Sequence, residues 1–174
     1  MPLIRGFAPL VPEKPHLLIL GSMPGQPSLN AREYYANRQN AFWPIIVALS
    51  RDEQPDRERA FALSYRQRCT GLAELGIALW DVLAHCRRVG SLDAAIERDS
   101  EFANDIAALL HEHPSIHTLC FNGQTAARLF RRHFGEPPSG IGSQTLPSTS
   151  PAYASLSLDE KYKQWRDALG LLQR

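Results

Sequence analysis

Runs of apolar residues alternate along the chain with segments in which apolar positions recur every three or four residues. The runs at 16–20, 77–83 and 116–122 are short and almost continuously apolar, as expected for parallel strands that are covered on both faces. A fourth short strand is expected within 143–153, ahead of a loop rich in serine and proline. Residues 1–15 carry four prolines and predict an extended lead-in.

Helical periodicity fills most of the chain between these strands. Pro44 is compatible with the first turn of a helix, where a missing N–H costs little, and Gly76 is a typical helix stop. Ser91 and Asp93 are candidate N-terminal caps, whereas 51–59 is expected to be a charged surface connection. Helices are therefore predicted at 42–50, 63–76, 91–113, 123–135 and 158–172.

Strands that alternate with helices indicate a parallel α/β fold. We expect one domain over residues 1–174, folded as a three-layer α/β/α sandwich with a central four-stranded parallel sheet. Ligands of such sheets bind at the carboxyl ends of the strands. Three loops would lie there, at 21–41, 122–124 and 147–154, and the first begins with GSMPGQPS, which should continue neither a strand nor a helix.

The charge balance changes this picture only locally. Lys+Arg total 19 and Asp+Glu total 18, which excludes a uniformly basic coat and an acidic tail. Within 21–44, 121–132 and 145–154, however, five arginines accompany a single acid, Glu33. This excess suits either a nucleic-acid surface or a solvated helix face. Sixteen basic residues are arginines, and the lysines are Lys14, Lys161 and Lys163.

Several protein classes are excluded by patterns that the chain lacks. No stretch approaches 18 apolar residues, and prolines and charges interrupt the N-terminus, so neither a membrane span nor a signal peptide is predicted. Cys69, Cys86 and Cys120 form no C-x-x-C pair, and His111 with His113 lacks a third ligand. We therefore expect no disulfide and no metal. The G-x-S-x-G elbow, the P-loop and G-x-G-x-x-G are also missing.

The three loops offer amides, hydroxyls, glycines and aromatic rings with little charge. This composition suits a neutral, planar ligand that forms hydrogen bonds and stacks on a ring, such as a nucleobase. Simpler interpretations stay open: Asn37 and Asn40 could be turn residues, and Ser148 and Ser150 could form a local turn. Asp81 is interpreted as a structural hydrogen-bonding residue at a strand end.

Three segments carry a resemblance to a known family. They are LILGSMPGQPSL with YYANRQNAFWPI, then CFNGQTAARLF, then LPSTSPAYA, and GIALWDVL is similar to the family's second strand. Over residues 16–154 the chain resembles the uracil-DNA glycosylase superfamily, most closely its hypoxanthine-DNA (deoxyinosine) glycosylase branch. The resemblance implies an enzyme that rotates a damaged base out of duplex DNA and breaks its N-glycosidic bond.

The resemblance also implies roles for individual residues. Gly21, Ser22 and Met23 correspond to the loop that shapes the base pocket and holds the attacking water. Met23 stands where other branches carry a catalytic aspartate or asparagine, and its side chain cannot accept a proton from water. The hypoxanthine branch is similar in this respect, which implies Asn40, or alternatively Asn37, as the catalytic residue.

The remaining motifs imply contacts with the base and with the duplex. Phe42 matches the ring that stacks on the flipped base, and Asn122 matches the amide that reads the base edge. The family's bulky wedge aligns near Ala152, which is small, so Tyr153 is the alternative wedge. Further DNA contacts are expected from Ser148, Thr149, Ser150, Gln124 and Arg128.

We therefore expect a monofunctional DNA glycosylase of base excision repair that removes hypoxanthine from double-stranded DNA and leaves an abasic site. The three lysines lie outside the motif segments, so no amine is expected to form a Schiff base. A cytoplasmic, nucleoid-associated monomer without a cofactor is expected. Two alternatives stay open: a uracil-, xanthine- or mismatch-directed glycosylase of the same superfamily, and a lesion-binding module without catalysis.

Overall fold

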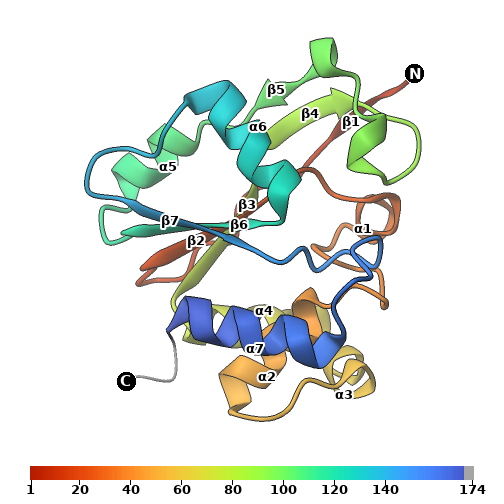
Figure 1. Ribbon diagram of the computed structural model, residues 1–174, viewed down its shortest axis with the longest axis vertical. Coiled ribbons are helices and arrows are strands. Elements are labelled where there is room, and N and C mark those ends of the chain that lie inside the picture. The colour runs from red at the N-terminus through yellow and green to blue at the C-terminus, as the bar shows by residue number, and fades with distance from the viewer. Residues whose placement is uncertain (171–174) are drawn as a thin grey trace.

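A parallel four-stranded sheet forms the centre of the molecule. The computed structural model describes residues 1–170, and its main sheet has the strand order β3-β2-β6-β7 (Figure 1). All three neighbouring pairs are parallel, which confirms the predicted sheet. The strands are β2 (Leu17–Gly21), β3 (Ile77–Asp81), β6 (Thr118–Asn122) and β7 (Gly142–Leu146).

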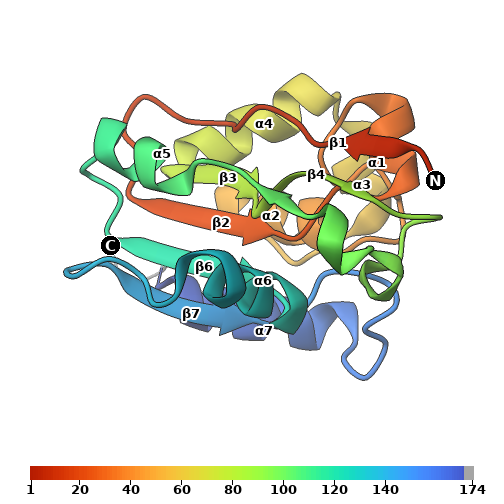
Figure 2. The same cartoon turned by 90° about the horizontal axis from the view of Figure 1, so that it is seen from above.

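The central strand β2 is buried on both faces, as its continuous apolar run predicts. Leu17 and Ile19 pack into one hydrophobic core, whereas Leu18 and Leu20 pack into the other. This alternation follows from the opposite directions of successive side chains in a strand. The two cores separate three layers, as predicted for an α/β/α sandwich (Figure 1), and Figure 2 looks down through the layer of α5 and α6 onto the sheet.

The described residues form seven helices, most of which lie on the two sides of the sheet. On the lower side in Figure 1, α2 packs against α4 and α7, while α6 packs on β6 and β7 from the other side. Ser64 and Ser157 begin α4 and α7 with capping boxes. The helices are α1 (Gln26–Ala31), α2 (Phe42–Arg51), α3 (Arg57–Ala62), α4 (Tyr65–Glu74), α5 (Ile106–Glu112), α6 (Gln124–Phe134) and α7 (Leu158–Leu169).

The predicted helix at 91–113 is wrong over most of its length. Only α5 is helical there, and it begins after Asp105, whose side chain accepts a hydrogen bond from the Ala108 N–H at 3.0 Å. The preceding segment forms two 3₁₀ turns, Asp93–Ala95 and Arg98–Ser100. Ser91 and Asp93 begin no α-helix in their own segment: Asp93 accepts a hydrogen bond from Ser22 in the loop after β2, and Ser91 accepts one from the Gln26 N–H at the start of α1.

A second, antiparallel sheet was not predicted. It has the order β1-β4-β5 and consists of β1 (Leu3–Arg5), β4 (Leu83–Arg87) and β5 (Phe102–Ala103). The apolar run at 77–83 therefore contains the whole of β3 and the first residue of β4, with Val82 between the two strands. Residues 1–15 are rich in proline, so the pairing of β1 with β4 was not expected, although β1 is extended as predicted.

Several smaller predictions also need correction or fall outside the described chain. The expected loop at 21–28 contains the start of α1, and the expected connection at 51–59 contains the start of α3. Gly76 follows α4 with φ +68°, which agrees with its predicted role as a helix stop. The last part of the helix predicted at 158–172 lies outside the described residues.

Candidate functional site

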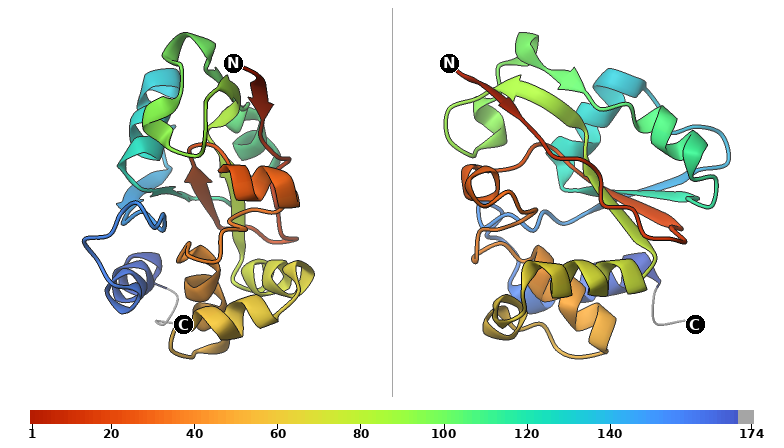
Figure 3. Two further views of the ribbon diagram at one scale, coloured as in Figure 1. Left: turned by 90° about the vertical axis from the view of Figure 1, so that its right-hand side faces the viewer. Right: turned by 180° about the vertical axis from the view of Figure 1, so that it is seen from behind.

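A cavity of about 340 Å³ opens at the carboxyl edge of the main sheet. The left panel of Figure 3 looks onto this edge, where the loops after β2, β4 and β7 meet. The cavity is lined by residues of all three loops that were predicted to hold the site, together with Asp81 and a segment that was not predicted, Ser91–Asp93. A second cavity of about 510 Å³ adjoins it and reaches the start of α6.

Gly21 allows the first loop to approach the end of β3 closely. Gly21 and Asp81 are paired in register on neighbouring strands. A Cβ atom at position 21 would lie 2.4 Å from Asp81 Oδ1 and 2.9 Å from the Tyr35 hydroxyl. No side chain fits there, so glycine is required for Asp81 and Tyr35 to share this wall of the cavity.

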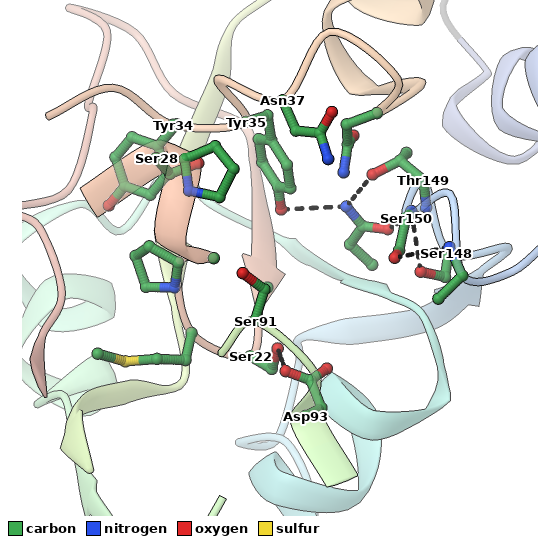
Figure 4. Close-up of a pocket in the computed structure, with 18 of the residues that line it drawn as sticks. Ser22, Ser28, Tyr34, Tyr35, Asn37, Ser91, Asp93, Ser148, Thr149 and Ser150 are labelled. Atoms are coloured by element: carbon green, nitrogen blue, oxygen red, sulfur yellow. Dashed lines mark hydrogen bonds between the residues drawn. The ribbon is translucent and has the colours of Figure 1, made fainter. Parts of the chain in front are cut away.

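Ser22 and Met23 line the cavity as predicted, although each has a structural contact as well. The Ser22 hydroxyl donates to Asp93 Oδ1 at 2.8 Å (Figure 4). Met23 is 6% exposed and packs into the core beneath α6. Residues 21–23 therefore shape one wall of the cavity, and Ser22 holds the Ser91–Asp93 segment against that wall.

Asn37 and Asn40 both line the cavity and both form turns. Asn37 Oδ1 accepts from the Gln39 N–H at 3.0 Å, and Asn40 Oδ1 accepts from the Phe42 N–H at 2.9 Å. Each amide oxygen keeps one lone pair. Within residues 1–170, neither side-chain NH₂ group donates a recorded hydrogen bond. The turn interpretation and the catalytic prediction are therefore compatible with the same geometry.

Phe42 lies beneath the cavity and does not line it. Its side chain is fully buried in the core, and the Tyr35 ring stacks on it with centroids 4.1 Å apart. Tyr35 lines the cavity and has φ +53°, an uncommon conformation for a bulky residue. Tyr34 also lines the cavity but is 3% exposed, so the partly exposed ring there is Tyr35, which covers Phe42.

Asn122 uses its whole carboxamide to join the three loops. Its Nδ2 donates to the Tyr35 hydroxyl at 3.0 Å and to Thr149 Oγ1 at 2.9 Å, and its Oδ1 accepts from the Thr149 N–H at 3.0 Å (Figure 4). Both N–H donors are thus occupied. Asn122 Oδ1 keeps a second lone pair, so this cavity-lining amide can join the loops and still accept a hydrogen bond from a base.

The third loop is folded by its own side chains. Ser148 Oγ accepts from the Ser150 N–H, and Ser150 Oγ accepts from the Ala152 N–H, both at 3.2 Å. Thr149 is 1% exposed, so its predicted contact with DNA is not supported. Ser148 and Ser150 line both cavities and remain partly exposed, as a phosphate contact requires.

Several arginines of the basic surface predicted around the three loops are engaged in contacts within the protein. Gln124 and Arg128 are exposed at the start of α6, and Arg128 Nη2 donates to Thr125 Oγ1 at 3.1 Å. Arg132 forms an ion pair with Glu101 at 2.6 Å. The Arg38 guanidinium lies 5.3 Å above the Phe61 ring. Gln124 lines the second cavity, so the start of α6 is the part of this surface nearest to the site.

Asp81 was not predicted as a site residue, yet it is a buried acid in the cavity wall. It is 4% exposed, and within the described chain its Oδ2 has no hydrogen-bond partner. Burial, followed by the nearby negative charge of Asp93, raises the pKa of Asp81 to about 7. Asp81 therefore titrates near neutral pH and keeps an unused hydrogen-bond acceptor within the described chain. Its position at a strand end beside Gly21 was the signal in the sequence.

Two features, a cluster of metal ligands and a membrane-spanning helix, are absent from the described residues. Among residues 1–170, no group of three or more His, Cys, Asp and Glu side chains is arranged to hold a metal. His111 and His113 lie in the last turn of α5 and just after it. No helix in this part of the chain is long and apolar enough to cross a membrane.

Known proteins that resemble this chain match it over nearly its whole length. The family model described as the uracil DNA glycosylase superfamily matches residues 8–170. A protein of Methanosarcina acetivorans named hypoxanthine DNA glycosylase is 32% identical over 164 residues, which is 92% of this chain and 94% of the relative. A protein of the same name from Methanosarcina barkeri is 31% identical over 167 residues, covering 94% of this chain and 96% of that one.

A solved structure supports the same relationship. The solution NMR structure of a candidate uracil DNA glycosylase from Methanosarcina acetivorans matches with a TM-score of 0.75 and 28% identity, over 99% of both chains. The main sheet, the cavity at its carboxyl edge and the matched motifs agree with this similarity. The chain belongs to the uracil DNA glycosylase superfamily.

Proposed function

We propose that this protein is a DNA glycosylase that removes hypoxanthine from deoxyinosine in duplex DNA by hydrolysis and leaves an abasic site. The observation that carries the proposal is a cavity with a buried carboxyl group, the side chains of Asn37 and Asn40, and the Tyr35 ring in its walls. The name shared by the two Methanosarcina relatives supports hypoxanthine as the base. The protein acts as a monomer on DNA in the cytoplasm, where the nucleoid lies.

Asp81 is the group we propose for base recognition. Hypoxanthine carries an N1–H donor next to its O6 acceptor, whereas adenine carries an N1 acceptor next to an amine. The Asp81 carboxylate lines the cavity and accepts N1–H, whereas adenine would turn its N1 lone pair toward this carboxylate. Because uracil also presents an N–H beside a carbonyl, Asp81 favours deaminated bases as a class. Tyr35 supplies the ring that stacks on the base.

Asn40 is the group we propose for water activation, with Asn37 as the alternative. The second lone pair of Asn40 Oδ1 accepts a hydrogen bond from the attacking water, while the first stays on the Phe42 N–H. That backbone bond fixes the side chain and so positions the water. The N-glycosidic bond breaks toward an oxocarbenium-like sugar, and water then adds at C1′. The departing purine takes up a proton, so the net reaction is hydrolysis.

Simple hydrolysis also follows from where the lysines lie. No lysine is among the described residues that line either cavity. Lys161 comes closest, since its Nζ donates to the Ser150 carbonyl oxygen at 3.1 Å and is 5% exposed beneath the third loop. An amine held in this way does not reach a sugar in the cavity. The proposed enzyme therefore cuts no strand.

The test is a set of duplexes that carry one deoxyinosine, deoxyuridine or deoxyxanthosine at the same position. Alkali reveals base release as strand cleavage, and we expect the fastest release from deoxyinosine. If uracil or xanthine is released faster than hypoxanthine, that base is the preferred substrate and the proposal for hypoxanthine is wrong. Retention of the deoxyinosine duplex without base release would identify a binding module instead. Borohydride added during the reaction should trap no protein–DNA adduct, and an adduct would contradict hydrolysis by water.

A further inference from the structure

Leu92 is an exposed apolar residue at the mouth of the proposed site. The exposed large hydrophobic residues of the described chain are Met1, Leu3, Val89, Leu92, Phe102 and Tyr153. Of these, Leu92 and Tyr153 line a cavity. Leu92 is 62% exposed and lines both adjoining cavities, as does Ala152 from the third loop. Leu92 therefore belongs to the rim that any flipped nucleotide must pass.

The residues before Leu92 are held by a buried arginine. Arg88 is 2% exposed, and its Nε donates to the Gly90 carbonyl oxygen at 2.9 Å. Its Nη2 donates to the carbonyl oxygen of Pro24 in the first motif. Ser91 Oγ accepts from the Gln26 N–H at 2.8 Å. The segment that presents Leu92 is therefore attached to the first loop of the site.

The residues after Leu92 are held as firmly. Asp93 accepts from the Ser22 hydroxyl at 2.8 Å, and the Leu92 carbonyl oxygen accepts from the Ala95 N–H at 3.0 Å. The Glu97 N–H closes the segment by donating to the Arg87 carbonyl oxygen at 2.9 Å. Because the backbone is fixed on both sides, Leu92 meets a partner at a low cost in conformational entropy.

The third loop offers no comparable side chain. Ala152 is too short to replace a base in a stack. Tyr153 is 42% exposed, but its ring lies 5.4 Å from Lys161 Nζ, which is itself bonded to Ser150 of the same loop. Tyr153 is thus partly engaged with its own loop. The apolar side chain that is both free and rigidly presented at the rim is Leu92.

We propose that Leu92 is the wedge of this enzyme, the side chain that enters the base stack beside the flipped nucleotide. Proteins that open duplex DNA commonly insert leucine or a similar apolar residue between base steps. This inference rests on the proposed function, and it assigns the wedge to the segment after β4 in place of the third loop. Tyr153 and the serines of the third loop then contact the strand on the other side of the cavity.

Single-turnover base release tests the proposal on duplex and on single-stranded DNA with one deoxyinosine. A wedge is needed only where a stack must be opened, so Leu92→Ala should lower the duplex to single-strand rate ratio about ten-fold. Leu92→Met keeps an apolar wedge and should restore most of the ratio. Val89→Ala is the matched control, because Val89 is 66% exposed on the same segment and lines neither cavity. An unchanged ratio in Leu92→Ala overturns the proposal.

A second measurement needs no base release and separates this proposal from the proposed function. A duplex carries non-cleavable 2′-fluoro-deoxyinosine with 2-aminopurine as its neighbour, whose fluorescence rises when it loses its stacking partner. The wild-type protein and Val89→Ala should raise the fluorescence, and Leu92→Ala should give a much smaller rise at saturating protein. An equal rise with Leu92→Ala rules out the wedge, even if hypoxanthine is not the base that the enzyme removes.

Discussion

The Asn122 carboxamide donates to the Tyr35 hydroxyl at 3.0 Å and so joins two loops that lie 87 residues apart in the sequence. The same carboxamide exchanges two further hydrogen bonds with Thr149. One side chain therefore fixes the relative positions of all three motif loops. This junction gives Asn122 a structural role, and its contact with the base stays a prediction.

Replacing Asn122 should destabilise the fold and the site together. Asn122→Ala removes three hydrogen bonds and leaves the buried Thr149 N–H without an acceptor, so we expect a loss of about 2–3 kcal/mol in the free energy of unfolding. Thr149→Val removes only one of these bonds and should cost about 1 kcal/mol. Urea unfolding measures both losses. Equal stability of Asn122→Ala and the wild type would contradict the structural role.

The two candidate catalytic amides can be separated by paired substitutions. If Asn40 positions the water, Asn40→Ala should lower the single-turnover rate about 10²–10³-fold, whereas Asn37→Ala should have a much smaller effect. Asn40→Ser is a control for the turn, because a serine hydroxyl can still accept from the Phe42 N–H. A full rate with Asn40→Ala, together with a large loss for Asn37→Ala, would transfer the role to Asn37.

The pH dependence of base release should report Asp81. The carboxylate is the form that accepts N1–H, and burial raises its pKa to about 7. The rate should therefore fall as the pH is lowered from 8 to 6 in the wild type. Asp81→Asn carries no titrating group, and its rate should be lower but nearly independent of pH in this range. A wild-type pH profile retained by Asp81→Asn would assign the titration to another group.

The same carboxyl group should make the fold less stable at higher pH. The folded protein holds a proton on Asp81 that the unfolded chain releases at about pH 4, so the folded state binds more protons between about pH 4 and 7. The free energy of unfolding contributed by this group therefore decreases as the pH rises through that window. Asp81→Asn should remove the decrease and be the more stable protein at pH 8. Urea titrations at pH 5 and pH 8 measure the difference.

Tyr35 should contribute to binding of the base rather than of the DNA backbone. Tyr35→Ala removes the ring that faces the cavity and should weaken binding to a duplex with 2′-fluoro-deoxyinosine by about 1–3 kcal/mol. Binding to a duplex with an abasic-site analogue should change little. Tyr35→Phe keeps the ring and loses only the bond to Asn122, so it should bind nearly as the wild type does. Equal losses on both duplexes would contradict stacking.

The sequence predicted those elements whose burial is visible in the local pattern of apolar residues. Strands β2, β3 and β6 are mostly buried, so their nearly continuous apolar runs identify them, and Gly76 ends a helix as expected. The segment at 91–113 was misjudged because Ser91 and Asp93 resemble helix caps. Their partners, the Gln26 N–H and the Ser22 hydroxyl, are 65 and 71 residues away, and tertiary contacts overrode the local preference.

In the candidate site, too, local pattern predicted some features and tertiary packing decided the others. Motif positions predicted which loops form the cavity, since those loops follow neighbouring strands. They could not show that Tyr35 covers Phe42, because both rings occur in one aromatic stretch and only packing decides which faces the cavity. Asp81 was also underestimated. Its importance depends on a buried carboxyl group beside Gly21 whose Oδ2 has no partner among residues 1–170, which no spacing along the chain reveals.

The hydrogen bonds that join the walls of the cavity have a consequence for the product of the reaction. Ser22 with Asp93 and Asn122 with Tyr35 and Thr149 hold the walls together through contacts within the protein alone. The pocket therefore needs no DNA to form, and a free purine of the right hydrogen-bonding pattern should enter it. Released hypoxanthine should compete with damaged DNA, so the enzyme is expected to slow as its own product accumulates, whereas adenine should not inhibit it.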